Sequence, residues 1–127
     1  KRFVKRVAPT TVITQQNPAN AQLPALLWKL DNYAALFDAS GGTGTLPKFW
    51  HGPLTGIICG YAGGLGPDTL ENELPLIATV AGDRPFWVDM ESRLRTTDAL
   101  GHDWFDIDAA RQCLELVATV TPTLEMA

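Results

Sequence analysis

The sequence has only two cysteines, Cys59 and Cys113, among its 127 residues. Both stand in apolar stretches without CxxC spacing or a nearby histidine cluster, which argues against a disulfide framework and a zinc site. We therefore expect two buried free thiols. The sequence predicts no metal and no cofactor.

Long apolar runs are also absent from the sequence. None approaches the roughly 20 apolar residues that span a bilayer, and no charged-then-apolar leader opens the chain. We therefore predict a cytoplasmic protein with no membrane partner. Hydrophobic residues make up 46% of the sequence and charged residues 19%, a balance typical of a globular protein and unlike that of a disordered chain.

Positive charge is scarce, because 10 Lys and Arg stand against 14 Asp and Glu, which gives a net charge of -4. This balance predicts no nucleic-acid partner. A basic cluster at residues 1–6 is interpreted as a solvated helix end, with nucleic-acid contact as the alternative. The length predicts a single domain over residues 1–127, with mobile ends at 1–8 and 122–127.

Strand-like segments alternate with turns and helix-like stretches, which is the pattern of parallel βα units. Four strands are predicted, at residues 11–14, 34–37, 56–61 and 85–88. Each is followed by a polar or glycine-rich turn, at residues 15–18, 38–44, 62–68 and 89–93. The helix after the second strand is poorly marked, because Pro47 and residues 49–53 form an irregular stretch.

Three further helices are predicted from apolar residues at helical spacing. The first has Leu23, Leu26, Leu27 and Leu30 on one face, with Pro24 at its first position. The second runs through Leu70, Leu74 and Ile77, with a kink at Pro75. Asp106 is expected to cap the third, which ends at residues 121–122. Its buried face would carry Ile107, Ala110, Cys113, Leu114 and Val117. The tryptophans are interpreted as core residues: Trp28, Trp50, Trp87 and Trp104.

Two glycines follow the third predicted strand. In parallel α/β proteins the loops after the strands converge, and the next helices direct their N-termini at this edge of the sheet. Gly63 and Gly64 would let the backbone approach a ligand closely, and unpaired N–H groups at the helix start favour an anion such as phosphate. A tight turn uses the same dipeptide, so both interpretations stay open.

Carboxylates follow the second and fourth predicted strands. Asp38 is a candidate general acid, or else it accepts hydrogen bonds from the backbone of its own loop. Asp89 and Glu91 form a carboxylate pair that belongs either to the site or to ion pairs with neighbouring arginines. Among these arginines, Arg93 is a candidate for a charge-assisted contact with phosphate.

Four short segments resemble a known family: Leu-Phe-Asp-Ala at 36–39, Gly-Gly-Thr-Gly at 41–44, Tyr-Ala-Gly-Gly-Leu-Gly-Pro-Asp at 61–68 and Val-Asp-Met-Glu-Ser at 88–92. In order and spacing they resemble the last three βα units of phosphoribosylanthranilate isomerase, over residues 30–120. The resemblance implies an α/β fold with parallel βα units that form the C-terminal half of a TIM (β/α)8 barrel. A flavodoxin-like rearrangement is the alternative if the unit is isolated.

The resemblance also implies an activity. The family carries out an Amadori rearrangement of an aminoribose phosphate in tryptophan biosynthesis, which is an aldose-ketose isomerisation. Asp38 would be the general acid, and the loops around Gly63, Gly64 and Ser92 would hold the phosphate. Together with the residues argued above, the predicted substrate- and phosphate-binding set is Gly42, Thr43, Gly44, Gly63, Gly64, Leu65, Asp89, Ser92 and Arg93.

The sequence departs from the family in three places. The family's base is a cysteine on the first barrel strand, which has no counterpart here, and neither Cys59 nor Cys113 inherits the role. The family's Asp-Val-Ser-Ser-Gly-Val-Glu segment is Asp-Met-Glu-Ser-Arg-Leu-Arg at residues 89–95, with Arg93 in place of a glycine. Residues 48–50 lack the family's aspartate.

Two functions are therefore predicted. The first is a divergent isomerase that binds a phosphorylated sugar and is completed by a missing N-terminal half. The second is a non-catalytic phosphate-binding or assembly module that has lost the base. In both cases, a homo-oligomer or a partner segment would cover the open edges of the sheet.

Overall fold

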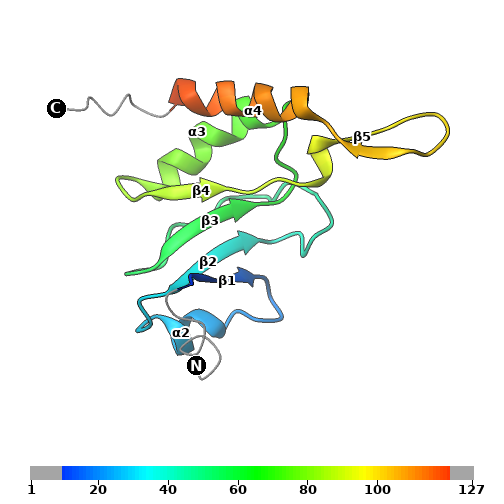
Figure 1. Cartoon of the computed structure of the whole chain (residues 1–127). Coiled ribbons are helices and arrows are strands. Elements are labelled where there is room, and N and C mark those ends of the chain that lie inside the picture. Colours follow the sequence, from blue (N-terminus) through cyan, green and yellow to red (C-terminus); the bar gives the residue numbers. More distant parts are fainter. Residues whose placement is uncertain (1–9, 121–127) are drawn as a thin grey trace.

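A parallel sheet is the central element of the computed structural model, which describes residues 10–120 (Figure 1). The four strands lie in the order of the sequence: β1 (Val12–Gln16), β2 (Tyr33–Asp38), β3 (Ile58–Ala62) and β4 (Phe86–Val88). The helices are α2 (Leu23–Leu27), α3 (Leu70–Ala81) and α4 (Ile107–Val120). The expected α/β class and the parallel sheet are confirmed. The predicted mobile ends and the helix stop at 121–122 lie outside the described residues.

The sheet has two different faces because successive side chains of a strand point to opposite sides. On one side, here called the outer face, Ala35 of β2 and Cys59 and Tyr61 of β3 pack into the hydrophobic core with side chains of all three helices. On the opposite side, the inner face, Ile13 of β1 and Ile58 of β3 are 52% and 56% exposed. The hydrophobic core therefore lies on the outer face, and the inner face exposes apolar side chains.

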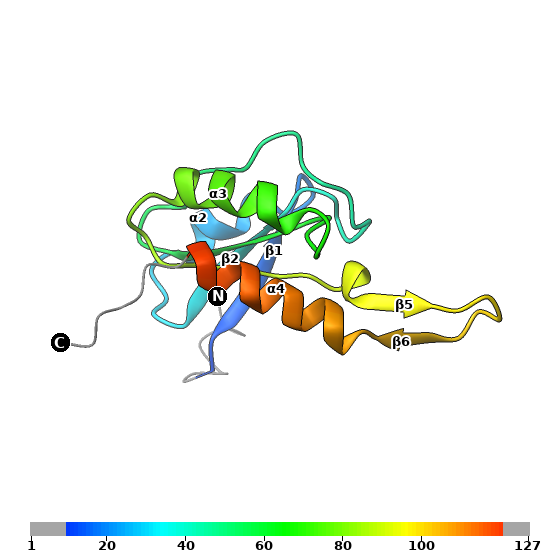
Figure 2. The ribbon, with the colours of Figure 1, turned by 90° about the horizontal axis from the view of Figure 1, so that it is seen from above.

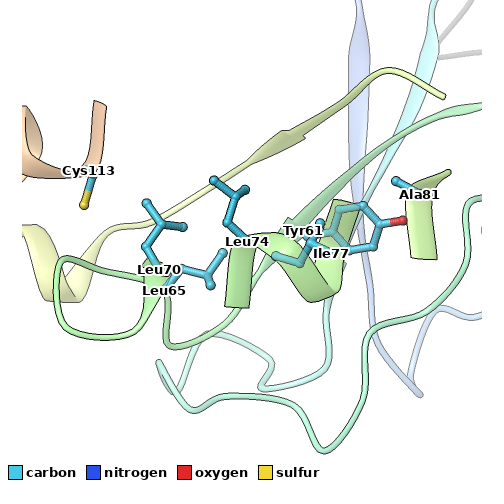
Figure 3. Close-up of a cluster of buried hydrophobic side chains, with 7 residues drawn as sticks. All are labelled: Tyr61, Leu65, Leu70, Leu74, Ile77, Ala81 and Cys113. Atoms are coloured by element: carbon cyan, nitrogen blue, oxygen red, sulfur yellow. The ribbon is translucent and has the colours of Figure 1, made fainter. Parts of the chain in front are cut away.

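Two hydrophobic clusters make up the core. The larger one joins β3 to α3 and α4 (Figure 3) through Tyr61, Leu65, Leu70, Leu74, Ile77, Ala81 and Cys113. The smaller one joins β2 and β3 to α2 through Leu27, Tyr33, Ala35, Ile57 and Cys59. Both cysteines are buried and free, as predicted. Burial raises the pKa of each thiol, which disfavours the reactive thiolate.

The connection between β2 and β3, residues 39–57, contains neither a helix nor a strand. The helix that was poorly marked in the sequence is therefore absent. Trp50 fixes the connection to α3, because its Nε1 donates a hydrogen bond to Glu73 Oε2 at 2.8 Å. Arg84 fixes it near its end, because Nη1 donates to the carbonyl oxygen of Leu54 at 2.8 Å. Side-chain hydrogen bonds thus hold a segment that has no helical hydrogen bonds of its own.

A hairpin follows β4, where the sequence predicted only a polar stretch. It consists of a short 3-10 helix, η1 (Ser92–Leu94), and two antiparallel strands, β5 (Arg95–Thr97) and β6 (Asp103–Phe105). Figures 1 and 2 show that β5 and β6 project away from the sheet and the helices. The core position predicted for Trp104 is wrong, because this side chain is about half exposed on β6. Trp28, at the end of α2, is exposed to a similar degree.

The first βα unit differs in its boundaries from the prediction. Gln15 and Gln16 belong to β1 rather than to a turn. The helix α2 ends at Leu27, so Leu30 lies beyond it, and Pro24 stands in its first turn. The strand is longer and the helix shorter because Asn17 and Asn20, rather than residues 15 and 16, form the turn.

The last helix begins as predicted and presents a different face. Asp106 Oδ1 accepts hydrogen bonds from the backbone N–H groups of Asp108 and Ala109, both at 3.0 Å, and so caps α4. Ile107 and Leu114, predicted to be buried, are largely exposed. Leu116 packs on the larger cluster in their place.

Candidate functional site

A small cavity, here called the strand-end pocket, lies where the carboxyl ends of β2, β3 and β4 meet. Its volume is about 80 Å³. The loops after these strands supply its lining: Asp38, Ser40, Gly42, Gly44, Ala62, Gly63, Gly64, Leu65, Asp89, Met90, Glu91 and Ser92. The parallel strand order brings these loops to one edge of the sheet. All the predicted site residues except Thr43 and Arg93 therefore lie together.

Asp38 ends β2 and is only 5% exposed. Its Oδ1 accepts hydrogen bonds from the backbone N–H of Ser40 at 3.1 Å and from the Ser40 hydroxyl at 2.5 Å. Its Oδ2 accepts one from the backbone N–H of Gly42 at 2.9 Å and another from the side-chain amide of Gln15. A buried carboxylate requires such donors, and these fix the first turn of the loop. Asp38 thus has the structural role that the sequence left open beside general acid catalysis.

The backbone at Gly63 and Gly64 lies directly against the loop that follows β2. Both glycines have a positive φ, 110° and 65°. A Cβ atom on residue 64 would lie 2.6 Å from the backbone nitrogen of Leu46, and one on residue 63 would lie 3.0 Å from the carbonyl oxygen of Thr45. The close approach of two loops therefore explains this dipeptide even without a ligand.

The same two glycines line the pocket and carry backbone N–H groups without a described acceptor. Neither the N–H of Gly63 nor that of Gly64 donates a hydrogen bond to another residue in the described part of the chain. The carbonyl oxygen of Gly64 is engaged, because it accepts a hydrogen bond from the Thr69 hydroxyl at 2.9 Å. Free amides in a glycine loop ahead of a helix form the kind of concavity that binds anions.

Charge is unevenly distributed around the pocket. Asp89 and Glu91, on the loop after β4, add two carboxylates to that of Asp38. Ser92 adds a hydroxyl, and a Cβ atom on Gly44 would lie 2.8 Å from its Oγ. Asp89 and Glu91 would repel a phosphate, whereas they can accept hydrogen bonds from sugar hydroxyls. The glycine side of the pocket suits an anion, and the carboxylate side suits a polyol.

Two predicted site residues have other partners. Arg93 Nη1 forms an ion pair with Asp68 Oδ2 at 2.5 Å, and its side-chain stem packs over Gly66. Thr43 Oγ1 donates a hydrogen bond to the carbonyl oxygen of Ser40 at 3.0 Å. Neither residue lines the strand-end pocket.

Sequence analysis missed Gln15 and Ser40, which both bind Asp38. Gln15 was assigned to a turn, so it had no strand neighbour in the prediction. A signal for Ser40 was present, because an aspartate often accepts a hydrogen bond from the backbone two residues later. Here that bond is made by the N–H of Ser40.

Neither a metal-binding cluster nor a membrane-spanning helix is found within the described residues. No group of three or more His, Cys, Asp or Glu side chains there is arranged to hold a metal ion. None of the helices in residues 10–120 has the length and apolar content of a membrane span. Comparisons with protein-family models, with curated proteins and with solved structures gave no match. The function is therefore inferred from the pocket and the fold.

Proposed function

We propose that the strand-end pocket binds the phosphate of a phosphorylated sugar. The observation that carries this proposal is the pair of N–H groups at Gly63 and Gly64 that donate to no described residue, at the edge where three parallel strands end. Ser92, which carries a hydroxyl, lines the same pocket. Backbone amides and hydroxyls at this edge commonly hold phosphate in α/β proteins. Asp89 and Glu91 would receive the sugar hydroxyls.

The strand order supports a barrel segment. Strands β1 to β4 are neighbours in the order of the sequence and are all parallel. Successive units of a (β/α)8 barrel have this order. A flavodoxin-like sheet reverses its strand order after the first strand, and no reversal occurs among the four described strands. We therefore propose a half-barrel whose lumen side is the inner face.

A half-barrel of this kind needs a cover for its inner face and its edges. Ile13 and Ile58 are about half exposed on that face, and β1 and β4 are the outermost strands of the described sheet. Apolar side chains and free strand edges both favour association. We propose that a second copy of the chain, or a partner segment that supplies further strands, covers them.

The corresponding activity is a divergent isomerase of the phosphoribosylanthranilate isomerase kind. In that reaction an acid protonates the ring oxygen of an aminoribose phosphate, and a base removes the proton from the neighbouring carbon. Asp38 would supply the acid, and the glycine side of the pocket would hold the phosphate. No cysteine is among the described residues that line the pocket, so the cysteine that is the base in that family would have to come from elsewhere.

A non-catalytic phosphate-binding module is the second candidate, and two observations favour it. Both oxygens of Asp38 are already engaged by the loop that it fixes. The pocket volume of about 80 Å³ is below the range of about 300–1,000 Å³ that is usual for whole small-molecule sites. A phosphate group fits this size better than a complete substrate.

Thermal unfolding with ribose 5-phosphate, ribose and inorganic phosphate tests the binding proposal. We expect ribose 5-phosphate, at tenfold its Kd, to raise Tm by about 4 °C, and ribose to leave Tm unchanged. Ser92→Ala should reduce the shift. Thr97→Ala, at an exposed position of the hairpin, is the matched control and should retain it. Equal shifts with ribose and ribose 5-phosphate, or none with either, contradict phosphate binding.

Turnover of phosphoribosylanthranilate tests whether the chain itself is an isomerase. The isomerase candidate predicts conversion that Asp38→Asn abolishes. The module candidate predicts no conversion by a chain that still shows the shift with ribose 5-phosphate. Conversion that survives Asp38→Asn would exclude Asp38 as the acid.

A further inference from the structure

We propose that the chain has a second ligand site, on the outer face, for an uncharged small molecule that contains a ring. The site is a cavity of about 340 Å³ between the turn that leads into α2 and the connection from β2 to β3. It is here called the outer cavity, and the residues that matter for its chemistry are Gln16, Ala21, Phe37, His51 and Leu54. Its size falls within the usual range for small-molecule sites.

The outer cavity exists because one crossover helix is missing. In a series of parallel βα units, each crossover helix packs on the sheet beside its neighbours. Residues 39–57 contain no helix, although α2 and α3 are present on either side. An extended chain fills less of the space between these two helices than a helix with its side chains would. The cavity therefore follows from the topology and not from one missing side chain.

The wall of the outer cavity is aromatic and apolar. The rings of Phe37 and His51 are stacked, with centroids 5.4 Å apart and an interplanar angle of 25°. Leu54 and two prolines, Pro18 and Pro24, add apolar surface. No carboxylate, lysine or arginine is among the residues that line the cavity. A charged ligand would lose its hydration there without gaining a counter-ion, so the chemistry favours an uncharged ring.

One buried polar side chain remains available to such a ligand. Gln16 lines the outer cavity and is only 7% exposed. Its amide nitrogen donates to Thr14, at 2.7 Å to Oγ1 and 3.2 Å to the carbonyl oxygen. No described residue donates a hydrogen bond to its Oε1. This oxygen is therefore free to accept a hydrogen bond from a hydroxyl or N–H on the ligand.

The walls are held in place, so the outer cavity does not depend on a ligand to form. Arg84 fixes Leu54 through the hydrogen bond to its carbonyl oxygen at 2.8 Å. On the other side, Asn20 Oδ1 accepts a hydrogen bond from the N–H of Asn17 at 2.9 Å, and Asn17 Oδ1 accepts one from the N–H of Ala19 at 2.9 Å. A preformed site loses little conformational entropy when the ligand binds.

The outer cavity is separate from the strand-end pocket. Phe37 and Asp38 are successive residues of β2, so their side chains point to opposite faces of the sheet. Phe37 lines the outer cavity and Asp38 lines the strand-end pocket. A ligand in one site therefore does not occupy the other, and the two proposals can fail independently.

Calorimetric titration of the whole chain with 2-naphthol and naphthalene tests the second site. 2-Naphthol is an uncharged bicyclic ring with one hydroxyl donor, and naphthalene lacks the donor. We expect saturable binding of 2-naphthol with 1:1 stoichiometry, and about fivefold weaker binding of naphthalene because one neutral hydrogen bond is lost. Gln16→Met should remove this preference while naphthalene still binds. Ribose 5-phosphate should not compete.

Two tryptophan variants, one inside the outer cavity and one outside it, test whether the ligand binds in that cavity. Ala21→Trp places a large side chain at an exposed position that lines the outer cavity, and it should abolish 2-naphthol binding. Ala25→Trp, an exposed position on α2 that does not line the cavity, should retain it. Circular dichroism and Tm show whether each variant is folded. Absence of 2-naphthol binding to the unaltered chain, or equal binding to both folded tryptophan variants, would overturn the proposal.

Discussion

The strand-end pocket and the outer cavity lie on opposite faces of the same strand end and differ in almost every property. The strand-end pocket is small, is built from glycine backbone and carboxylates, and is tied together by hydrogen bonds to Asp38. The outer cavity is about four times larger, is lined mainly by apolar and aromatic side chains, and includes Gln16, whose amide oxygen has no donor among the described residues. The backbone geometry of the loops shapes the strand-end pocket. The outer cavity is the space that a crossover helix between β2 and β3 would otherwise fill.

The comparison shows that sequence motifs and available volume need not coincide. The glycine-rich segments around residues 41–44 and 63–64 are the most recognisable part of the sequence, yet Gly63 and Gly64 lie directly against the backbone of residues 44–46. The outer cavity depends on residues that form no motif. A motif therefore points to the polar contacts of a site more reliably than to its size.

The largest effect is expected from Gly64→Ala. A Cβ on residue 64 would meet the backbone of Leu46 at 2.6 Å, and φ is +65°. Strain and overlap together should lower the free energy of unfolding by about 3 kcal/mol in urea titration. Gly41→Ala is the control, because φ is +63° there and nothing lies within 4 Å of the added atom. The control should lose only about 1 kcal/mol.

Equal losses for the two glycine variants would show that the contact between the loops contributes nothing. The strand-end pocket would then not differ from the outer cavity in how tightly its loops are packed.

Asp38→Ala should have the next largest effect. It leaves the donors of Ser40, Gly42 and Gln15 without their acceptor. We expect a loss of about 2–3 kcal/mol in the free energy of unfolding, together with faster amide exchange at Ser40 and Gly42. Exchange at Leu54, in the wall of the outer cavity, should stay unchanged. Faster exchange at Leu54 as well as at Ser40 and Gly42 would show that the two sites unfold as one cooperative unit.

The two hydrophobic clusters each contain a tyrosine, and the two hydroxyls differ in their hydrogen bonding. The Tyr33 hydroxyl, in the smaller cluster, forms a hydrogen bond with Thr14 Oγ1 at 2.8 Å. The Tyr61 hydroxyl, in the larger cluster (Figure 3), is buried and has no hydrogen-bond partner among the described residues. Tyr33→Phe should cost about 1 kcal/mol, whereas Tyr61→Phe should be neutral or stabilising. Urea titration of both variants checks this, and the reverse order would contradict the assigned hydrogen bonding.

The smallest effect concerns the cap of α4, which lies outside both sites. A hydrogen bond from the Thr96 hydroxyl, together with those from the backbone N–H groups of Ala109 and Asp108, lowers the pKa of Asp106. The folded value lies below the unfolded one, so the carboxylate contributes stability above the unfolded value, near pH 4, and loses it as the pH falls through the folded value. Asp106→Asn should flatten this acid dependence of the free energy of unfolding. An unchanged slope would contradict the cap.

Much of the fold could be predicted because short apolar segments are each followed by a polar or glycine-rich turn. The second strand was predicted at residues 34–37, and β2 spans Tyr33–Asp38. The hairpin at β5 and β6 was missed because its strands are three residues each and expose Trp104 and Phe105, so no buried period marks them. The face of α4 was misjudged because Ile107 and Leu114 are apolar but largely exposed.

The site could be predicted only in part. The residues of the strand-end pocket follow from the rule that parallel strands end at one edge. Whether Gly64 meets a ligand or Leu46 depends on the path of a loop, which no local pattern encodes. The outer cavity depends on a helix that is absent and on the pairing of Phe37 with His51, a residue in the middle of that same connection.

Titration of the ¹⁵N-labelled chain with inorganic phosphate tests the central claim most directly. Phosphate held by the glycine amides should give saturable chemical-shift changes at Gly63, Gly64 and Ser92. Asp89→Asn combined with Glu91→Gln should tighten phosphate binding, because two nearby negative charges are removed. Unchanged amides at residues 63 and 64 while the rest of the spectrum is intact would contradict the phosphate site.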